Sequence, residues 1–142
     1  MKMIKITTDN QISVHEFPEG AYMEQNRILR EHIGPKCELY EHVMPKRLYE
    51  VLGGSRRVTS NPGECVSMLV DKDGYFHDLE DNMVGSWLYE TDKHMCPIKG
   101  NILIVGEYWE GTGINFSGIS EEQFSLLYPK LEKIVEKARK KI

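Results

Sequence analysis

The stretch Gly53–Glu64, with the sequence GGSRRVTSNPGE, contains the residues whose types and spacing are best suited to chemistry. Arg56 and Arg57 each carry a planar fork of N–H donors that fits a phosphate or a carboxylate, and the glycines before them would let backbone N–H groups approach the same anion. The stretch also contains three neutral side-chain donors, Ser55, Thr59 and Asn61. We predict a loop that binds an anion; the alternative is a solvated connector without a ligand.

Two further pairs of residues would add to this site. Lys46 and Arg47 lie shortly before the stretch and extend its positive charge. Tyr108 and Trp109 are aromatic neighbours, and the turn-forming residues that follow place Trp109 in a predicted loop, where a large exposed ring needs a partner. A base stacked on either ring, or a protein interface, would cover it. Packing of Trp109 onto the start of the C-terminal helix is the alternative.

The sequence lacks the residues that define the common catalytic and nucleotide-binding motifs. Gly111-Thr112-Gly113 would need a third glycine where Phe116 stands to form a dinucleotide-binding fingerprint, and no glycine run is followed by the lysine of a P-loop. The five histidines never occur at the i, i+4 spacing of paired metal ligands on a helix. We therefore predict no catalytic residue, no cofactor and no metal. A metal-dependent phosphodiesterase site at His77 and Asp78 stays as the enzymatic alternative.

The chain is acidic overall, with a formal net charge of −4. Several of its basic residues lie between Lys130 and Ile142, where they complement the end of a helix, so the remainder of the chain is more acidic still. Such a body repels the phosphates of duplex nucleic acid, and direct duplex binding is not expected. If the protein instead binds a basic host protein, its contact surface would consist of the clustered carboxylates Glu16, Glu19, Asp71, Asp73, Asp78, Glu80 and Asp81.

The sequence favours a cytoplasmic protein without a membrane segment. The first residues lack the apolar region of a secretory signal, and the longest apolar runs are too short to cross a bilayer. The three cysteines, Cys37, Cys65 and Cys96, have no paired spacing, which indicates reduced thiols.

Apolar alternation predicts a hairpin of two strands over residues 4–8 and 12–16, and further strands at 37–43, 65–71 and 101–106. We also expect Asp73-Gly74 to form a tight turn that pairs Tyr75-Phe76 back against the strand at 65–71.

Helical spacing predicts a helix over residues 21–33, a helical turn from Pro45 to 52, and a short helix over 83–89 capped by Asn82, where a strand is the alternative. Ser120-Glu121-Glu122-Gln123 is a capping box that begins a C-terminal helix, and Pro129 should kink or restart that helix. The sequence therefore predicts one α+β domain over residues 1–142. It would contain a small mixed β-sheet, two or three short helices, and a capped C-terminal helix with a basic tail over residues 119–142.

Four stretches resemble a family of small proteins of bacteriophages, prophages and conjugative elements that is catalogued as a domain of unknown function. They are LREHIGPKCELYEHV (Leu29–Val43), VSMLVDKDGYFHDLEDNMVGSWLY (Val66–Tyr89), PIKGNILIVGE (Pro97–Glu107) and GISEEQF (Gly118–Phe124). The likeness covers most of residues 1–127. It implies an accessory protein of a mobile element and supplies no catalytic residues, while the arginine-containing stretch and the basic tail go beyond the family pattern.

These observations lead to two hypotheses for function. The first is a non-enzymatic counter-defence protein that sequesters a small anionic, nucleotide-like ligand through Arg56 and Arg57, and a homo-oligomer could close such a site from two copies of the loop. The second is an inhibitor that binds a host defence protein through its acidic surface.

Overall fold

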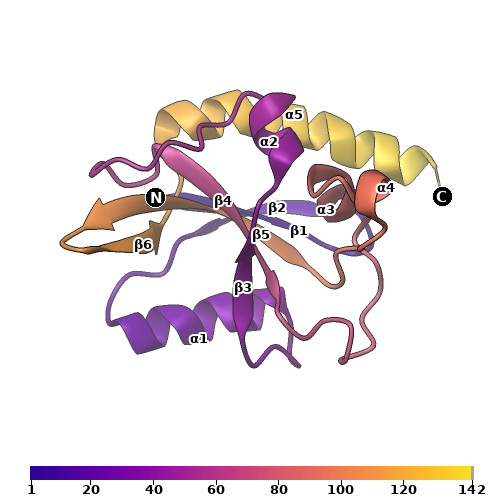
Figure 1. The fold of residues 1–142 in the computed structure, drawn as a ribbon, viewed down its shortest axis with the longest axis horizontal. Helices are drawn as coiled ribbons and strands as arrows, with labels where there is room; N and C mark the ends of the chain where they lie inside the picture. Colours follow the sequence, from indigo (N-terminus) through magenta and orange to yellow (C-terminus); the bar gives the residue numbers. More distant parts are fainter. Residues whose placement is uncertain (142) are drawn as a thin grey trace.

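The computed structural model describes residues 1–141 and is built around one antiparallel β-sheet (Figure 1). The strand order is β2-β1-β5-β4-β3, and β6 pairs with the part of β5 that β1 leaves free. Every strand pair is antiparallel, so the predicted mixed sheet is corrected to an antiparallel one. The strands are β1 (Lys2–Ile6), β2 (Ile12–Glu16), β3 (Tyr40–Val43), β4 (Cys65–Asp71), β5 (Ile102–Glu110) and β6 (Gly113–Ser117).

Helices cover both faces of this sheet. The helices are α1 (Tyr22–Ile33), α2 (Lys46–Glu50), α3 (Met83–Leu88), α4 (Thr91–His94) and α5 (Glu121–Lys140). Helix α1 lies on one face, and α5 crosses the opposite face together with α2 and α3 (Figure 1). The predicted α+β class is confirmed. Among residues 1–141, no helix has both the length and the apolar character needed to cross a bilayer.

The sheet has a hydrophobic core on each face, because successive side chains of a strand point to opposite faces. Along β5, Ile102 and Ile104 point to the α5 side, where they pack in a cluster with residues of that helix. Leu103 and Val105 point to the other side and pack with residues of α1. Because β5 is the central strand, its first four residues, Ile102–Val105, are completely buried on both faces and read as a continuous apolar run.

Most of the predicted elements are present. The hairpin near the N-terminus forms as β1 and β2, and the helices at α1 and α3 are confirmed. The Asn82 side chain accepts a hydrogen bond from the Gly85 N–H at 2.8 Å, and Ser120 accepts one from the Gln123 N–H at 3.2 Å, so both predicted N-caps are in place. Helix α5 continues through Pro129 without a restart.

Two local predictions are wrong. Tyr75 and Phe76 do not form a strand and are 78% and 85% exposed, because β4 already has β3 on one edge and β5 on the other. Trp109 does not lie in a loop, because β5 extends to Glu110 and turns back into β6. Gly111 begins the two-residue turn between these strands with a φ of 62°, a conformation that glycine adopts without strain.

Candidate functional site

A groove lies between the beginning of α1 and the β5–β6 hairpin; we call it the α1–β6 groove. It consists of two adjoining cavities of about 330 and 270 Å³ that share Phe17, Gly20, Gln25, Tyr108 and Phe116 as lining residues. The larger cavity is also bordered by Tyr22 and Tyr40. Five aromatic side chains therefore line two adjoining cavities beside the β5–β6 hairpin.

Polar side chains between these rings are held in place by local hydrogen bonds. The Tyr40 hydroxyl donates to Asn26 Oδ1, which joins β3 to α1. Gln25 Nε2 donates to the Pro18 carbonyl oxygen at 3.1 Å, which fixes the segment between β2 and α1. The groove thus combines apolar rings with amide groups that can recognise hydrogen-bonding partners.

The charge in the lining is predominantly negative. Glu19 borders the smaller cavity and Glu110 the larger one, and no lysine or arginine side chain of the described chain lines either cavity. Glu110 Oε2 accepts hydrogen bonds from the Tyr108 hydroxyl at 2.7 Å and from Asn115 Nδ2 at 3.1 Å. The bond to Glu110 raises the pKa of Tyr108, so the phenol stays neutral. The amino group of Met1, which lines the smaller cavity, is 3.5 Å from Glu16.

A buried polar cluster lies behind Phe116. The Glu107 side chain is only 6% exposed, and its Oε1 is 3.2 Å from His42 Nε2. The His42 ring also meets Phe116 edge-on. Cys65 Sγ lies 3.8 Å from the other carboxylate oxygen. Burial and the neighbouring Glu107 raise the pKa of Cys65 to about 12, so this thiol is not a ready nucleophile.

The arginine-containing stretch folds around one of its own carboxylates. Glu64 accepts hydrogen bonds from Thr59 Oγ1 at 2.8 Å and from Asn61 Nδ2 at 3.1 Å. The backbone of Ser55 is engaged on both sides, since its N–H donates to Gln123 Oε1 and its carbonyl accepts from the Val66 N–H. Two of the three neutral side-chain donors that we predicted for an external anion, Thr59 and Asn61, are therefore already engaged by Glu64.

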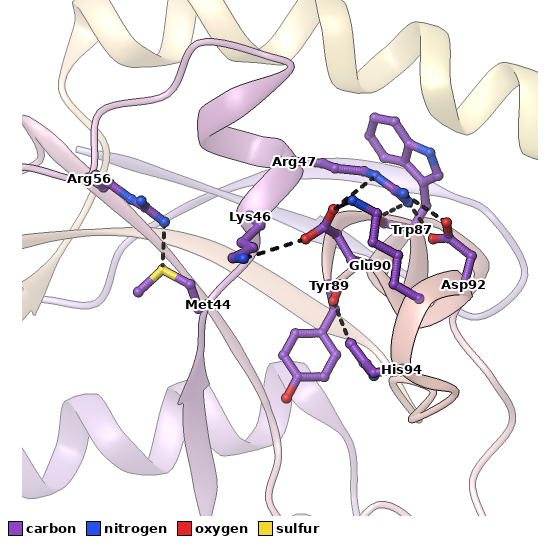
Figure 2. A network of polar contacts seen from close by, with 10 residues as sticks. Met44, Lys46, Arg47, Arg56, Trp87, Tyr89, Glu90, Asp92 and His94 are labelled. Carbon is purple, nitrogen blue, oxygen red and sulfur yellow. Dashed lines mark hydrogen bonds and ion pairs between the residues drawn. The ribbon is translucent and has the colours of Figure 1, made fainter.

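The two arginines of this stretch differ in their surroundings. The Arg56 guanidinium lies over the Tyr49 ring, 4.9 Å from its centroid. Its Nη2 also approaches Met44 Sδ at 3.5 Å (Figure 2). Arg57 is exposed, and its side chain makes no hydrogen bond or ion pair with residues 1–141. Whether these arginines bind a ligand stays a prediction.

Lys46 and Arg47 belong to a separate ion-pair network (Figure 2). Arg47 holds Asp92 in a bidentate contact of 2.6 and 2.9 Å, donates to the Trp87 carbonyl at 2.9 Å and lies over the Trp87 ring. Lys46 Nζ is 3.9 Å from Glu90. These contacts join α2 to the segment around α3 and α4, which gives both side chains a structural explanation.

The hairpin separates the two predicted aromatic residues. Tyr108 lines the groove, whereas Trp109 faces Ile114 across the hairpin, and both of these side chains are nearly half exposed. The Trp109 N–H donates to the Thr59 carbonyl at 2.7 Å, so the arginine-containing stretch is tied to β5 through its backbone.

The histidine of the enzymatic alternative has a different partner from the predicted one. His77 Nδ1 is 2.8 Å from Asp71 Oδ2, not paired with Asp78, and the Asp71 side chain is 1% exposed. Asp71 is therefore removed from the proposed acidic surface. Within residues 1–141, no three His, Cys, Asp or Glu side chains are grouped to hold a metal ion.

Comparison with protein-family models, with curated proteins and with solved structures gave no match. The resemblance to a mobile-element family therefore stays a prediction that rests on the quoted stretches.

Sequence reasoning identified Tyr108 but missed the rest of the groove. The signal that could have found it is the alternation of Gly113–Ser117 after a glycine-containing turn, which is typical of a second hairpin strand. The other walls come from segments far apart in the chain, Phe17–Leu29 and Tyr40, and no local pattern brings these together.

Proposed function

We propose that this protein is a non-enzymatic accessory protein of a mobile element that captures a partner protein, such as a host defence factor, in the α1–β6 groove. One observation carries the proposal: a depression of two adjoining cavities is lined by aromatic rings and amides and is bordered by carboxylates. The protein-binding hypothesis is kept, with its contact surface moved from scattered carboxylates to this groove.

The chemistry of the lining selects the kind of partner. Aromatic side chains dominate the energetics of protein interfaces because they bury much apolar surface at little entropic cost. Glu19 and Glu110 would attract a basic partner and repel an anion, since neither cavity has a lysine or arginine beside it. A segment that combines apolar and basic side chains fits this site better than a nucleotide phosphate does.

The test compares two charge reversals. Wild type, Glu110→Lys and Glu50→Lys are immobilised and exposed to lysate of the host cell, and bound proteins are identified by mass spectrometry. Glu50 is an exposed residue of α2 that does not line the groove, so its variant changes net charge equally. Each protein that the wild type retains is then purified and titrated against all three forms at low and high salt.

We expect a partner whose dissociation constant rises at least tenfold with Glu110→Lys, about 1.4 kcal/mol, and changes little with Glu50→Lys. Raised salt should weaken the wild-type complex. A purified partner that binds all three forms equally would refute a role for the groove.

A second candidate is the predicted sequestration of a small anionic, nucleotide-like ligand by Arg56 and Arg57. The observation in its favour is that the Arg57 guanidinium keeps all its donors available toward solvent. Thermal unfolding against cyclic and linear nucleotides tests it, because a ligand at a hundred times its dissociation constant stabilises by about 2.7 kcal/mol. The shift should vanish in the Arg56→Ala, Arg57→Ala variant, and a flat response to every nucleotide would count against the loop.

A further inference from the structure

The hydrogen bonds of β5 determine which backbone groups of β6 are free. In an antiparallel pair, residues opposite each other either exchange both backbone hydrogen bonds or exchange none. The Trp109 N–H donates to the Thr59 carbonyl and so points away from β6. Trp109 and Ile114 are opposite each other, and they therefore form a pair without hydrogen bonds.

A second bond, on the other side of β5, gives the same result. The Val66 N–H donates to the Ser55 carbonyl and so points away from β5, which makes Val66 and Gly106 a pair without hydrogen bonds. The next residue of β5, Glu107, must then direct its backbone groups toward β4. Glu107 is opposite Phe116, which consequently receives none of its backbone bonds.

The N–H and C=O groups of Ile114 and Phe116 accordingly point to the outer edge of β6. Neither residue exchanges backbone hydrogen bonds with its partner on β5, as shown above. These four groups have no other backbone hydrogen-bond partner among residues 1–141. Ile114 is 47% exposed. The edge therefore offers two donors and two acceptors to an external chain.

This edge lacks the features that usually block strand pairing. Proteins protect exposed edges with charged residues or proline. Strand β2 ends in His15 and Glu16, and β3 contains Glu41 and His42, whereas β6 has the uncharged sequence GINFS. Phe116 of the same strand also lines both cavities of the α1–β6 groove. The unprotected edge and the groove are thus one continuous surface.

We propose that the partner is bound by strand addition: an extended, basic segment of another protein pairs with the free edge of β6 and lies in the α1–β6 groove. This inference rests on the proposed function and specifies its binding mode. Main-chain hydrogen bonds to Ile114 and Phe116 would supply register, and alternate side chains of the segment would reach the aromatic cavities. A lysine or arginine in the segment would meet Glu19 or Glu110, the charged side chains of the lining.

The experiment selects peptides and then removes one donor. A displayed library of random heptapeptides is enriched on the wild-type protein, and the dissociation constant of a selected synthetic peptide is measured by fluorescence anisotropy. Ile114→Pro deletes the outward N–H without touching a bond to β5, as proline is accepted on edge strands in this orientation. Ile114→Ala is the matched control, because it removes the side chain and keeps the donor.

We expect selected peptides to be rich in lysine or arginine and in β-branched or aromatic residues. Binding should weaken at least tenfold with Ile114→Pro and less than threefold with Ile114→Ala. Because the proline variant could lose its fold, the same peptide is also prepared with alternate backbone amides methylated, and one of the two methylation patterns should abolish binding to the unaltered protein.

The outcomes separate the binding mode from the proposed function. If Glu110→Lys weakens the peptide while Ile114→Pro and both methylation patterns have no effect, the groove binds the peptide without strand addition and this inference is overturned. If no peptide is enriched, or neither Glu110→Lys nor Ile114→Pro changes affinity, both proposals fail. A wild-type dimer that Ile114→Pro dissociates in sedimentation would assign the edge to a second copy and would also overturn the inference.

Discussion

Replacing Asn82 by alanine should destabilise the fold strongly, because this one side chain joins three segments. Its Oδ1 accepts from the Gly85 N–H at 2.8 Å, which caps α3, and its Nδ2 donates to the carbonyls of Ile6 and Gly100, each at 3.0 Å. Asn82 is fully buried, so water does not replace these partners in the variant. Loss of the cap costs about 1 kcal/mol, and each lost carbonyl bond about 1 kcal/mol more.

The expected loss is therefore about 3 kcal/mol in the free energy of unfolding, measured by urea denaturation with circular dichroism detection. Asn101→Ala is the matched control, since the Asn101 side chain accepts one hydrogen bond, from the Thr8 N–H at 3.2 Å, and should cost about 1 kcal/mol. Equal losses in the two variants, or a loss under about 1 kcal/mol for Asn82→Ala, would refute the argument that three bonds depend on Asn82.

Three further predictions concern pH, an ion pair and the thiols. Burial lowers the pKa of both His15 and His32, whose ring centroids lie 4.6 Å apart and which are also near Lys5. The unfolded chain therefore binds protons first, and the free energy of unfolding should fall as pH drops below about 6.5. The His15→Gln, His32→Gln variant should show a smaller fall between about pH 7.5 and 5.5, and an unchanged fall would contradict this. Arg47→Lys should lower Tm by a few degrees because lysine cannot reproduce the fork toward Asp92, and an unchanged Tm would show that the network is dispensable. A thiol reagent should modify only Cys96 in the folded protein and all three cysteines after unfolding, since the other two are buried; modification of more than one thiol per folded chain would contradict the burial.

Much of the fold follows from local rules that the sequence displays. The capping residues Asn82 and Ser120 act within three residues of their position, and the apolar run of β5 marks a strand buried on both faces. Such signals depend on near neighbours, so they survive without knowledge of the tertiary structure. The hairpin predicted at Asp73-Gly74 is locally just as convincing, but Tyr75 and Phe76 do not pair with β4 because its edges are taken by strands distant in sequence.

Most of the candidate site could not be predicted from the sequence, because it too depends on contacts between segments distant in the chain. The adjacent Arg56 and Arg57 are visible in the sequence as a candidate anion site. The sequence does not show that Glu64 accepts the hydrogen bonds of the neighbouring side chains, because this depends on how the loop folds. The groove depends on the approach of α1 to the β5–β6 hairpin, and the free edge of β6 depends on which residues of β5 pair with Thr59 and β4. These are long-range facts that no window of the sequence contains.

Amide hydrogen exchange with and without an identified binding partner tests the central claim most directly. It reports protection along the whole chain and does not rely on a variant. The α1–β6 groove predicts slowed exchange at Ile114 and Phe116 and in the first turns of α1 when the partner is bound. Unchanged exchange there, with protection confined to Gly53–Glu64, would contradict it and assign binding to the arginine-containing stretch.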